Sequence, residues 1–233
     1  MERQLPNTEA FSGKAEVYAA ARPSYPDTAI EYIKSLVPKG AIFADVGAGT
    51  GKFTECLARH SLKLLAVEPN DDMREQLAKT LANYPDATIV AGTAEATTIA
   101  DSSVDAVTCA QALHWFNPDD FRAECRRILK PGGIVIAVYN RTLEREREGK
   151  GDSRGHIAIE NFFTNLTVRE FDNPVSYNRE SWVKFMLSHS RNPLPTDPEY
   201  AAHIEEVNAI FDEKNVEGLL HREMVTKVYH EVI

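Results

Sequence analysis

The residues best suited to chemistry are three glycines and two acids, namely Asp45, Gly47, Gly49, Gly51 and Glu68. The glycines follow a short apolar run, where they allow a sharp turn and let a ligand lie directly against the backbone. Glu68 ends the next apolar run, and a carboxylate there can accept hydrogen bonds from both hydroxyls of a ribose. An ordinary acid at a strand end is the plain alternative. With the glycines nearby the ribose role is favoured, so the pattern indicates a nucleoside-containing ligand.

The spacing of the glycines bears on which nucleoside ligand binds. A dinucleotide site prefers the pattern Gly-x-Gly-x-x-Gly, which would put its third glycine at position 52. That position holds Lys52, and the third glycine is Gly51. The shift argues against NAD, as does the absence of a Tyr-x-x-x-Lys pair. An NAD-dependent oxidoreductase therefore remains the weaker enzymatic alternative.

Short apolar runs alternate with stretches of helical periodicity between about residue 27 and residue 140. Such alternation is typical of a parallel sheet covered by helices on both faces. These sheets bind ligands beyond the carboxyl ends of their strands, near the point where the strand order reverses. We therefore predict an α/β Rossmann-like fold with its site just after the strands. The predicted strands cover residues 41–46, 62–67, 87–91, 104–110 and 134–138.

Two asparagines are well placed to begin helices. Asn70 precedes a stretch whose apolar residues fall on one helical face, and Asn117 is followed by Pro118, which suits the first helical position. The Lys-Pro-Gly-Gly turn at residues 130–133 is expected to end the second of these helices before a strand begins. Farther along, residues 141–156 predict a charged loop or frayed helix, and the final MVTKVYHEVI predicts a strand.

The composition bounds the class of protein. The chain has 233 residues, enough for one large α/β domain. Acidic residues outnumber basic ones by 35 to 26, a net charge of −9, whereas nucleic-acid binding draws on a basic face. No apolar stretch approaches the roughly 20 residues that cross a bilayer, and the three cysteines show neither metal-ligand spacing nor a disulfide framework. We expect a cytoplasmic monomer or homodimer that binds a small molecule, and no nucleic acid, membrane or metal.

Two strings resemble motifs of a known family. ADVGAGTGKFT is similar to the first motif of class I S-adenosylmethionine (SAM)-dependent methyltransferases, and AVEPNDDM is similar to their second. The resemblance covers residues 14–140 and extends more loosely to the C-terminus. It implies a mostly parallel seven-stranded sheet with helices on both faces, SAM as the cofactor, the glycine loop against its methionine part and Glu68 on its ribose. The implied cofactor contacts are Asp45, Gly47, Ala48, Gly49, Gly51, Glu68, Pro69, Met73, Ala94, Glu95 and Gln111.

Two of these implied contacts have alternatives. Met73 would pack beside the adenine, yet it fits the apolar stripe of its own helix equally well. The turn after the third strand would reach the adenine amino group through Ala94 or Glu95. Thr93 stands there in place of an aspartate that is frequent in the family, which leaves open which residue reaches the base.

The string QALHWF after the fourth predicted strand exposes a histidine and aromatic rings at the carboxyl edge of the sheet. It resembles the trans-aconitate methyltransferase-like branch of the family, as does YAAARPSYP near the N-terminus. That branch implies a helical lid over the cofactor, in which Tyr18 and Arg22 hold a substrate carboxylate. Packing and helix capping are the plain alternative. We therefore expect a catalytic surface of Tyr18, Arg22, His114 and Trp115, with Phe116 stapling the next helix.

The resemblance implies one domain in three parts: the lid (1–26), a cofactor-binding core (27–140) and an acceptor-side insertion with the last strands (141–233). The expected function is methyl transfer from SAM to a small molecule, on oxygen and perhaps on a carboxylate, which is a competent nucleophile without deprotonation. A hydroxyl or amine would need a base, for which His114 is best placed. Tyr139, Asn140 and Arg141 follow the fifth strand and are candidates for the acceptor pocket. A SAM-binding protein without catalysis is the alternative from another class.

Overall fold

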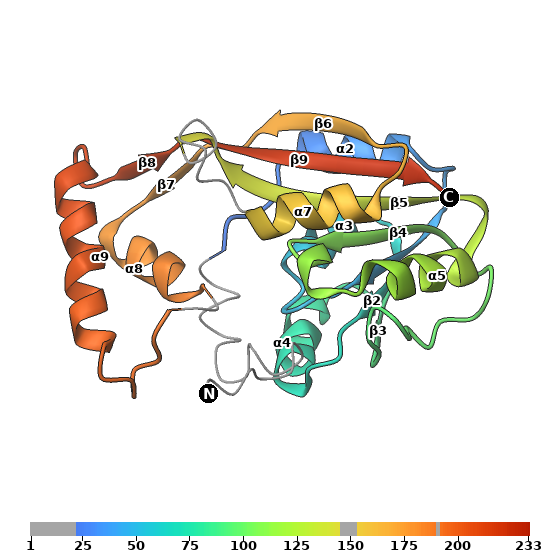
Figure 1. Cartoon of the computed structure of the whole chain (residues 1–233), viewed down its shortest axis with the longest axis horizontal. Coiled ribbons are helices and arrows are strands. Elements are labelled where there is room, and N and C mark those ends of the chain that lie inside the picture. Colours follow the sequence, from blue (N-terminus) through green and yellow to red (C-terminus); the bar gives the residue numbers. More distant parts are fainter. Residues whose placement is uncertain (1–21, 145–152, 190–191) are drawn as a thin grey trace.

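The computed structural model describes residues 22–144, 153–189 and 192–233. Its main feature is a seven-stranded sheet in the order β3-β2-β1-β4-β5-β9-β6 (Figure 1). This confirms the predicted Rossmann-like α/β fold with a mostly parallel sheet. The strands are β1 (Ile42–Val46), β2 (Lys63–Val67), β3 (Ala87–Val90), β4 (Val104–Ala110), β5 (Leu129–Thr142), β6 (Thr167–Asp172) and β9 (Met224–Val232).

The strand order reverses beside β1. The chain runs outward from β1 through β2 to β3, then returns to β4 on the other side of β1, and these neighbours pair in parallel. β5 pairs in parallel with β4, whereas β9 runs antiparallel between β5 and β6. The carboxyl ends of β1 and β4 diverge at the reversal, and this opening is where ligands bind in such sheets.

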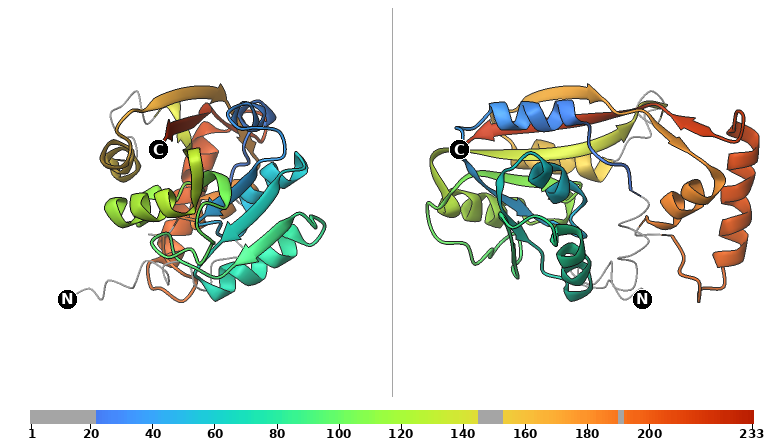
Figure 2. Two further views of the ribbon diagram at one scale, coloured as in Figure 1. Left: turned by 90° about the vertical axis from the view of Figure 1, so that its right-hand side faces the viewer. Right: turned by 180° about the vertical axis from the view of Figure 1, so that it is seen from behind.

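Two groups of helices cover opposite faces of the sheet. α2 (Asp27–Ser35), α3 (Lys52–Arg59) and α4 (Asp71–Leu81) cover one face. α5 (Pro118–Ile128) and α7 (Ser153–Phe162) cover the other, and the end-on view in Figure 2 shows α5 and α7 across the sheet from α2. None of the helices in the described ranges combines the length and apolar character that a bilayer span requires.

Alternation along β5 explains why both faces hold helices. Ile136 and Val138 pack with α2 and α3, whereas Val135, Ala137 and Tyr139 pack with α5 and α7. All five side chains are fully buried. A strand buried on both faces reads as a continuous apolar run, which is the pattern that the sequence shows.

Both predicted helix caps are confirmed. The Asn70 side chain accepts a hydrogen bond from the Met73 amide at 3.0 Å and begins α4. The Asn117 side chain accepts from the amides of Asp119 and Asp120, with Pro118 at the first helical position of α5. Each cap satisfies amides that have no partner inside the helix.

The region around the Lys-Pro-Gly-Gly turn differs from expectation. α5 does end there, but β5 already begins at Leu129, so the four residues lie inside the strand. The pairing with β4 shifts register across them, and Gly132 has a positive φ of 77°. The turn residues therefore form an irregularity within β5, because the strand pairs on both sides of them. Of residues 141–156, the first two belong to β5 and the last four to α7, while residues 145–152 lie outside the described ranges.

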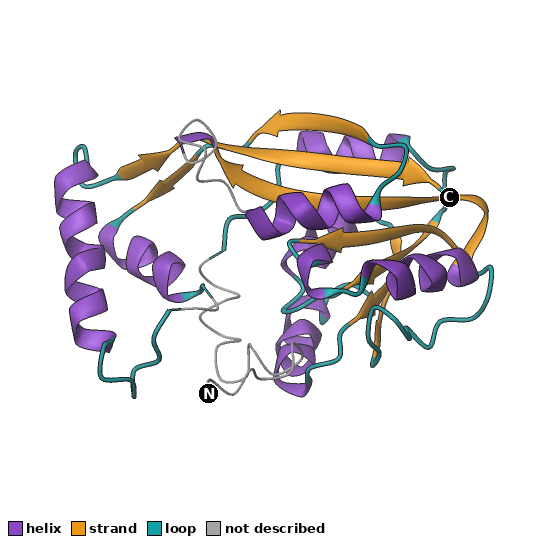
Figure 3. Ribbon diagram, viewed as in Figure 1, coloured by secondary structure: helices purple, strands orange, loops and turns teal. Residues whose placement is uncertain are grey.

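A second, smaller unit lies at one end of the sheet, drawn at the left of Figure 3. β7 (Val175–Tyr177) pairs with β8 (Leu220–Arg222), and α8 (Arg179–Leu187) packs on α9 (Tyr200–Lys214). We call this unit the distal lobe. Trp182 lies in its centre and donates from Nε1 to the Val207 carbonyl at 3.0 Å. The lobe has its own small apolar core, separate from the clusters that cover the main sheet.

Candidate cofactor and acceptor site

The glycine loop after β1 requires glycine at every predicted position. Gly47, Gly49 and Gly51 have φ values of 72°, 57° and 87°, a region that L-residues rarely adopt. A Cβ at Gly47 would lie 2.9 Å from the Ala112 Cβ, and one at Gly51 would lie 2.6 Å from a Leu77 methyl. A Cβ at Gly49 would meet nothing within 4 Å. The loop thus closes against the protein on two sides and opens at Gly49.

A cavity of about 220 Å³ lies at this opening. It occupies the carboxyl edge of the sheet between β1, β2 and β4, as the reversal of strand order predicts. Most of the expected site residues line it, namely Gly47, Gly49, Glu68, Pro69, Met73, Ala94, Glu95, Gln111 and Trp115. Its wall also includes residues that the sequence analysis did not assign to the site: Asn70, Thr93, Ala110, Ala112 and Phe116.

Glu68 is held in place by backbone amides. Gly49 N–H donates to Glu68 Oε2 and Asn70 N–H donates to Oε1, both at 2.9 Å. Burial raises the pKa of this carboxyl group, and the two amides oppose that rise. Each oxygen keeps a second acceptor site, so the carboxylate can receive two hydroxyl donors from a ligand in the cavity. This geometry fits a ribose.

Asp45 lies beneath the loop rather than on the cavity wall. Thr54 Oγ1 donates to Asp45 Oδ2 at 2.6 Å, and Thr108 Oγ1 donates to Oδ1 at 3.0 Å. Burial raises the pKa of Asp45 to about 6, against the effect of the two hydroxyls. The acid therefore ties α3 and β4 together under the glycines.

Ala48 and Gly51 are also behind the cavity wall. The amides of Gly47 and Ala48 donate to the Val67 carbonyl at 2.9 and 3.0 Å, which fastens the loop to the end of β2. Gly51 lies against α4, where the Leu77 methyl leaves no room for a side chain. These residues shape the loop, and Gly49 is the glycine that faces the open space.

The turn after β3 is fixed by an acid from α5. Glu124 Oε1 accepts from both the amide and the hydroxyl of Thr97, at 2.7 and 2.5 Å. Arg127 pairs with the same carboxylate through two nitrogens, at 2.7 and 2.8 Å. The Arg127 guanidinium lowers the pKa of Glu124 to about 2, more than burial raises it. This clamp holds the turn that presents Ala94 and Glu95 to the cavity.

Aromatic rings form part of the cavity wall. Trp115 and Phe116 line it, and His114 lies behind Trp115 with ring centroids 5.1 Å apart. His114 Nδ1 is 3.3 Å from the hydroxyl of the fully buried Tyr139. Gln111 reaches the wall with a positive φ of 56°, a conformation uncommon for a side-chain-bearing residue. Such backbone strain concentrates at functional sites.

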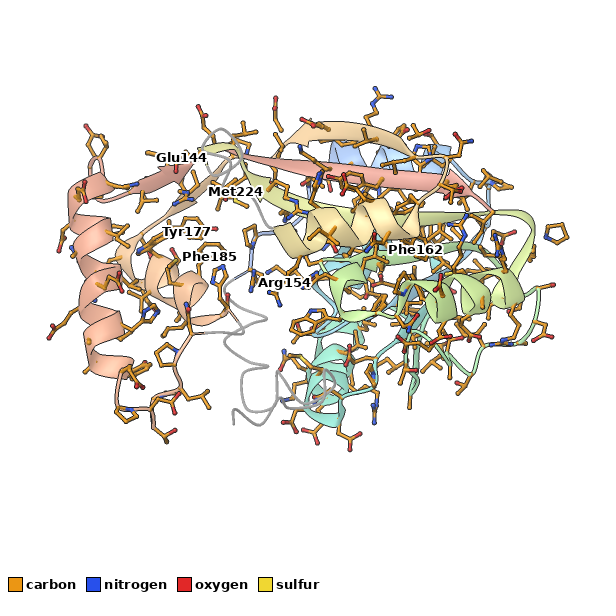
Figure 4. The ribbon with its side chains drawn as sticks, in the orientation of Figure 1. Glu144, Arg154, Phe162, Tyr177, Phe185 and Met224 are labelled. Carbon is orange, nitrogen blue, oxygen red and sulfur yellow. The ribbon has the colours of Figure 1, made fainter. Side chains whose placement is uncertain are left out.

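The N-terminal candidates lie elsewhere. Arg22 donates to the Ser188 carbonyl at 3.2 Å and sits 6.0 Å from the Phe185 ring, so it contacts α8 of the distal lobe. Figure 4 shows Phe185 and Tyr177 on the side of that lobe nearest the main sheet. Tyr18 lies outside the described residues. The structure therefore does not bring Arg22 to the cavity wall.

The residues after β5 serve different purposes. Asn140 donates to the Ser24 carbonyl at 3.2 Å and accepts from the Thr226 hydroxyl at 2.6 Å, which fastens the segment before α2 to the sheet. Arg141 is buried, with its guanidinium 4.4 Å from the centre of the Tyr139 ring. Tyr139 in turn lies behind His114. Of the three acceptor-pocket candidates, Tyr139 is thus the one that contacts a predicted catalytic residue.

The sequence offers different signals for the cavity-lining residues that were not predicted. Asn70 and Phe116 were visible in the sequence, but as a helix cap and a helix staple. The structure shows that Asn70 also lines the cavity, where its amide donates to Glu68. Ala110 and Ala112 carry no chemical signal and are recognisable only by their place after β4. Within the described ranges, no three or more histidine, cysteine or acidic side chains gather in a way that could hold a metal ion.

The open space at Gly49 and the carboxylate of Glu68 match what SAM needs from a protein. The ribose hydroxyls would lie on Glu68, the methionine part against Gly49, and the adenine between Met73 and the turn carrying Ala94. A Cβ at Gly49 would project into open space, so close backbone approach by a ligand is sterically free there. The residues present therefore fit this cofactor.

Comparisons with known proteins find methyltransferases among the relatives of this chain. A family model described as "Methyltransferase domain" matches residues 44–137. An uncharacterized methyltransferase of Schizosaccharomyces pombe is 30% identical over 209 residues, which cover 81% of this chain and 82% of that protein. The malonyl-[acyl-carrier protein] O-methyltransferase of Methylococcus capsulatus is 33% identical over 157 residues, 65% of this chain and 57% of that protein.

Solved structures share the fold. A protein from Anaeromyxobacter dehalogenans, provisionally named a type II methyltransferase, superposes with a TM-score of 0.67 at 21% identity, over 91% of this chain and 97% of that one. The chain spans about half the length of the curated relatives that it matches with 38% identity over 136 residues. The match to the S. pombe protein nevertheless covers most of both chains. The chain belongs to the class I SAM-dependent methyltransferase family.

Proposed function

We propose that this protein transfers a methyl group from SAM to an oxygen nucleophile of a small molecule, and that the nucleophile is a carboxylate. The observation that carries the proposal is one cavity whose wall includes Gly49, Glu68 and Trp115. When bound, SAM supplies an activated methyl group: the acceptor oxygen bonds to its carbon, the carbon–sulfur bond breaks with its electron pair on sulfur, and a methyl ester and S-adenosylhomocysteine result.

The chain's own residues align the reactants and exclude water. Glu68 fixes the ribose end because two backbone amides hold its carboxylate. The Glu124 clamp fixes the turn at the adenine end. Trp115 and Phe116 form an apolar wall near the reacting end, where they displace solvent from the acceptor. No proton needs to move when the acceptor is a carboxylate.

Charge argues against a nucleic-acid acceptor, and kinship favours a small acidic one. The net charge of −9 opposes binding to the phosphate backbone of nucleic acids. The related M. capsulatus protein is by name an O-methyltransferase acting on a malonyl group, which carries a free carboxylate. The YAAARPSYP and QALHWF strings support placement in the trans-aconitate methyltransferase-like branch.

His114 distinguishes two kinds of acceptor. A hydroxyl or protonated amine needs a base, and His114 contacts Trp115 on one side and Tyr139 on the other. For a carboxylate acceptor, His114 only supports the wall. Replacing His114 by alanine should then lower turnover less than tenfold and change SAM affinity less than threefold. A loss of SAM binding would instead place His114 in the cofactor pocket.

The test is transfer of a tritiated methyl group from SAM to a panel of small carboxylic acids, alcohols and amines, with the labelled products separated by chromatography. Methylation of carboxylic acids supports the proposal. Methylation of amines alone would contradict the acceptor class. Tight SAM binding with no turnover on any acceptor would favour the alternative, a SAM-binding protein without catalysis.

A further inference from the structure

Arg154 stands beside the aromatic end of the cavity. It lies in the first turn of α7, and its guanidinium carbon is 5.5 Å from the centre of the Trp115 ring. Figure 4 shows Arg154 at the end of α7 nearest the distal lobe, away from the labelled Phe162 at the other end. The side chain is exposed to solvent, and Trp115 lines the cavity. A cation therefore stands beside the cavity wall at Trp115.

The fold does not explain this cation. Arg122, Arg127 and Arg179 each pair with an acid, whereas Arg154 makes no ion pair or hydrogen bond with any described residue. A positive charge in the first turn of a helix opposes the helix dipole, and the first turn of α7 has no acid to offset it. Stability of α7 would favour an acid at this position.

The cavity has charges of opposite sign on and beside its wall. Glu68 lines it where the ribose of the cationic cofactor fits, with buried Asp45 beneath the loop. Arg154 lies over Trp115, another residue of the wall. A guanidinium pairs with a carboxylate through two parallel hydrogen bonds, and an indole face beneath it keeps the fork in one orientation. This arrangement suits an anionic acceptor that approaches a sulfonium.

We propose that Arg154 is an acceptor-binding residue that selects carboxylate substrates by holding the anion over Trp115. The inference rests on the proposed function and adds the residue that sets its specificity. The expected acceptors are small molecules with a carboxylate, either the one that is methylated or a second one that orients it. Neutral amides of the same acids should be poor acceptors and poor competitors.

The experiment compares Arg154→Gln and Arg154→Lys with the wild type in the tritiated-methyl assay. The probes are malonate, succinate, glutarate and benzoate, with the amide of each as its neutral counterpart. Arg154→Gln should raise the KM for the acids about 10- to 100-fold, the effect of losing a charge-assisted hydrogen bond. Arg154→Lys should recover part of the loss, because it restores charge without the planar fork. The KM for SAM should stay within threefold.

Arg126→Gln is the matched control, because Arg126 is an exposed arginine on α5 and does not line the cavity. It should leave every kinetic constant unchanged. If Arg154→Gln leaves the KM for the acids unchanged, or if wild type accepts amides as well as acids or methylates none of the acids, the inference is overturned. Methylation of the acids by wild type with an unchanged KM in Arg154→Gln would leave the proposed function standing, whereas wild type that binds no SAM or methylates none of the acids would remove both.

Discussion

The carboxyl edge of the main sheet and the distal lobe are built on different principles. At the edge, backbone groups determine the shape: three glycines adopt positive φ, and amides hold the Glu68 carboxylate. In the lobe, side chains determine the shape, since Trp182 is enclosed by its aromatic neighbours Tyr177 and Phe185. This chain therefore fixes its cofactor end mainly by backbone conformation and its distal lobe mainly by side-chain packing.

Both regions contain satisfied and unsatisfied buried polar groups. Glu68 and Asp45 have hydrogen-bond donors to both carboxylate oxygens. Among the described residues, the Thr50 hydroxyl in the glycine loop and the Tyr177 hydroxyl in the lobe are buried without a hydrogen-bond partner, and burial raises the pKa of Tyr177 to about 12. An unsatisfied buried group lowers stability. Because the lobe has an apolar core separate from the clusters on the main sheet, the cofactor edge should tolerate loss of the lobe core.

The largest expected effect comes from a variant that destabilises the distal lobe and leaves the carboxyl edge of the main sheet intact. Trp182→Ala removes a side chain that is 2% exposed and should lower the free energy of unfolding of the lobe by about 3–5 kcal/mol. Hydrogen exchange should accelerate in α8 and α9 and not in β1 or β4. Calorimetry should give a SAM affinity within threefold of wild type. A tenfold loss of SAM affinity would show that the regions are coupled.

Tyr177→Phe is the matched control for that variant. It keeps the ring that stacks on Phe185 with centroids 5.0 Å apart and removes only the unpartnered hydroxyl. Stability should be unchanged or rise by about 1 kcal/mol, because an unsatisfied buried group is removed. Thermal melting checks this, and a clear loss of stability would mean that the hydroxyl has a partner.

The middle effect acts at the cofactor edge. Glu68→Ala should weaken SAM binding by roughly 1–3 kcal/mol, through loss of charge-assisted hydrogen bonds. Asp86→Ala is the control, because Asp86 precedes β3 at the opposite edge of the sheet and should leave the affinity unchanged. Titration calorimetry measures both, and thermal melting confirms that both fold. An unchanged affinity in Glu68→Ala would rule out the ribose assignment.

The smallest expected effect concerns pH and the Glu124 clamp. The folded-state pKa of Glu124 is about 2, below its ordinary value of 4.5, so its contribution to stability is present above about pH 4.5 and is lost as pH falls toward about 2. Arg122 and Thr164 also lower the pKa of Glu231 to about 2, against the effect of burial. Glu231 therefore contributes to stability over the same pH range. Glu124→Gln should therefore flatten only part of the acid decline in melting temperature. An identical decline in variant and wild type would contradict the clamp.

Sequence reasoning succeeded where one residue type determines local geometry. Asn70 and Asn117 were predictable as caps because few side chains can accept from the first helical amides. The parallel strands were predictable because burial on both faces leaves an apolar run. Most of the cavity wall could be predicted from the strand ends, because Gly49, Glu68 and Gln111 stand directly after or near them.

Sequence reasoning was less informative where contacts between segments far apart in the chain determine the position of a side chain. Glu124 carries no signal in the sequence, because its role depends on Thr97, 27 residues earlier in the chain. Arg154 stood in a charged segment without periodicity, and only the packing of α7 brings it to Trp115. Asp45 and Gly51 were assigned to the ligand, but their positions behind the loop depend on Thr54, Thr108 and α4.

The central claim is that the cavity at Gly49 and Glu68 binds SAM. Its most direct test is calorimetric titration of the full chain with SAM, S-adenosylhomocysteine and NAD. We expect micromolar binding of the first two and none of NAD, because the open glycine and the ribose acid are present while the third glycine of a dinucleotide loop is displaced to Gly51. Binding of NAD without SAM, or of none of the three, would contradict the account.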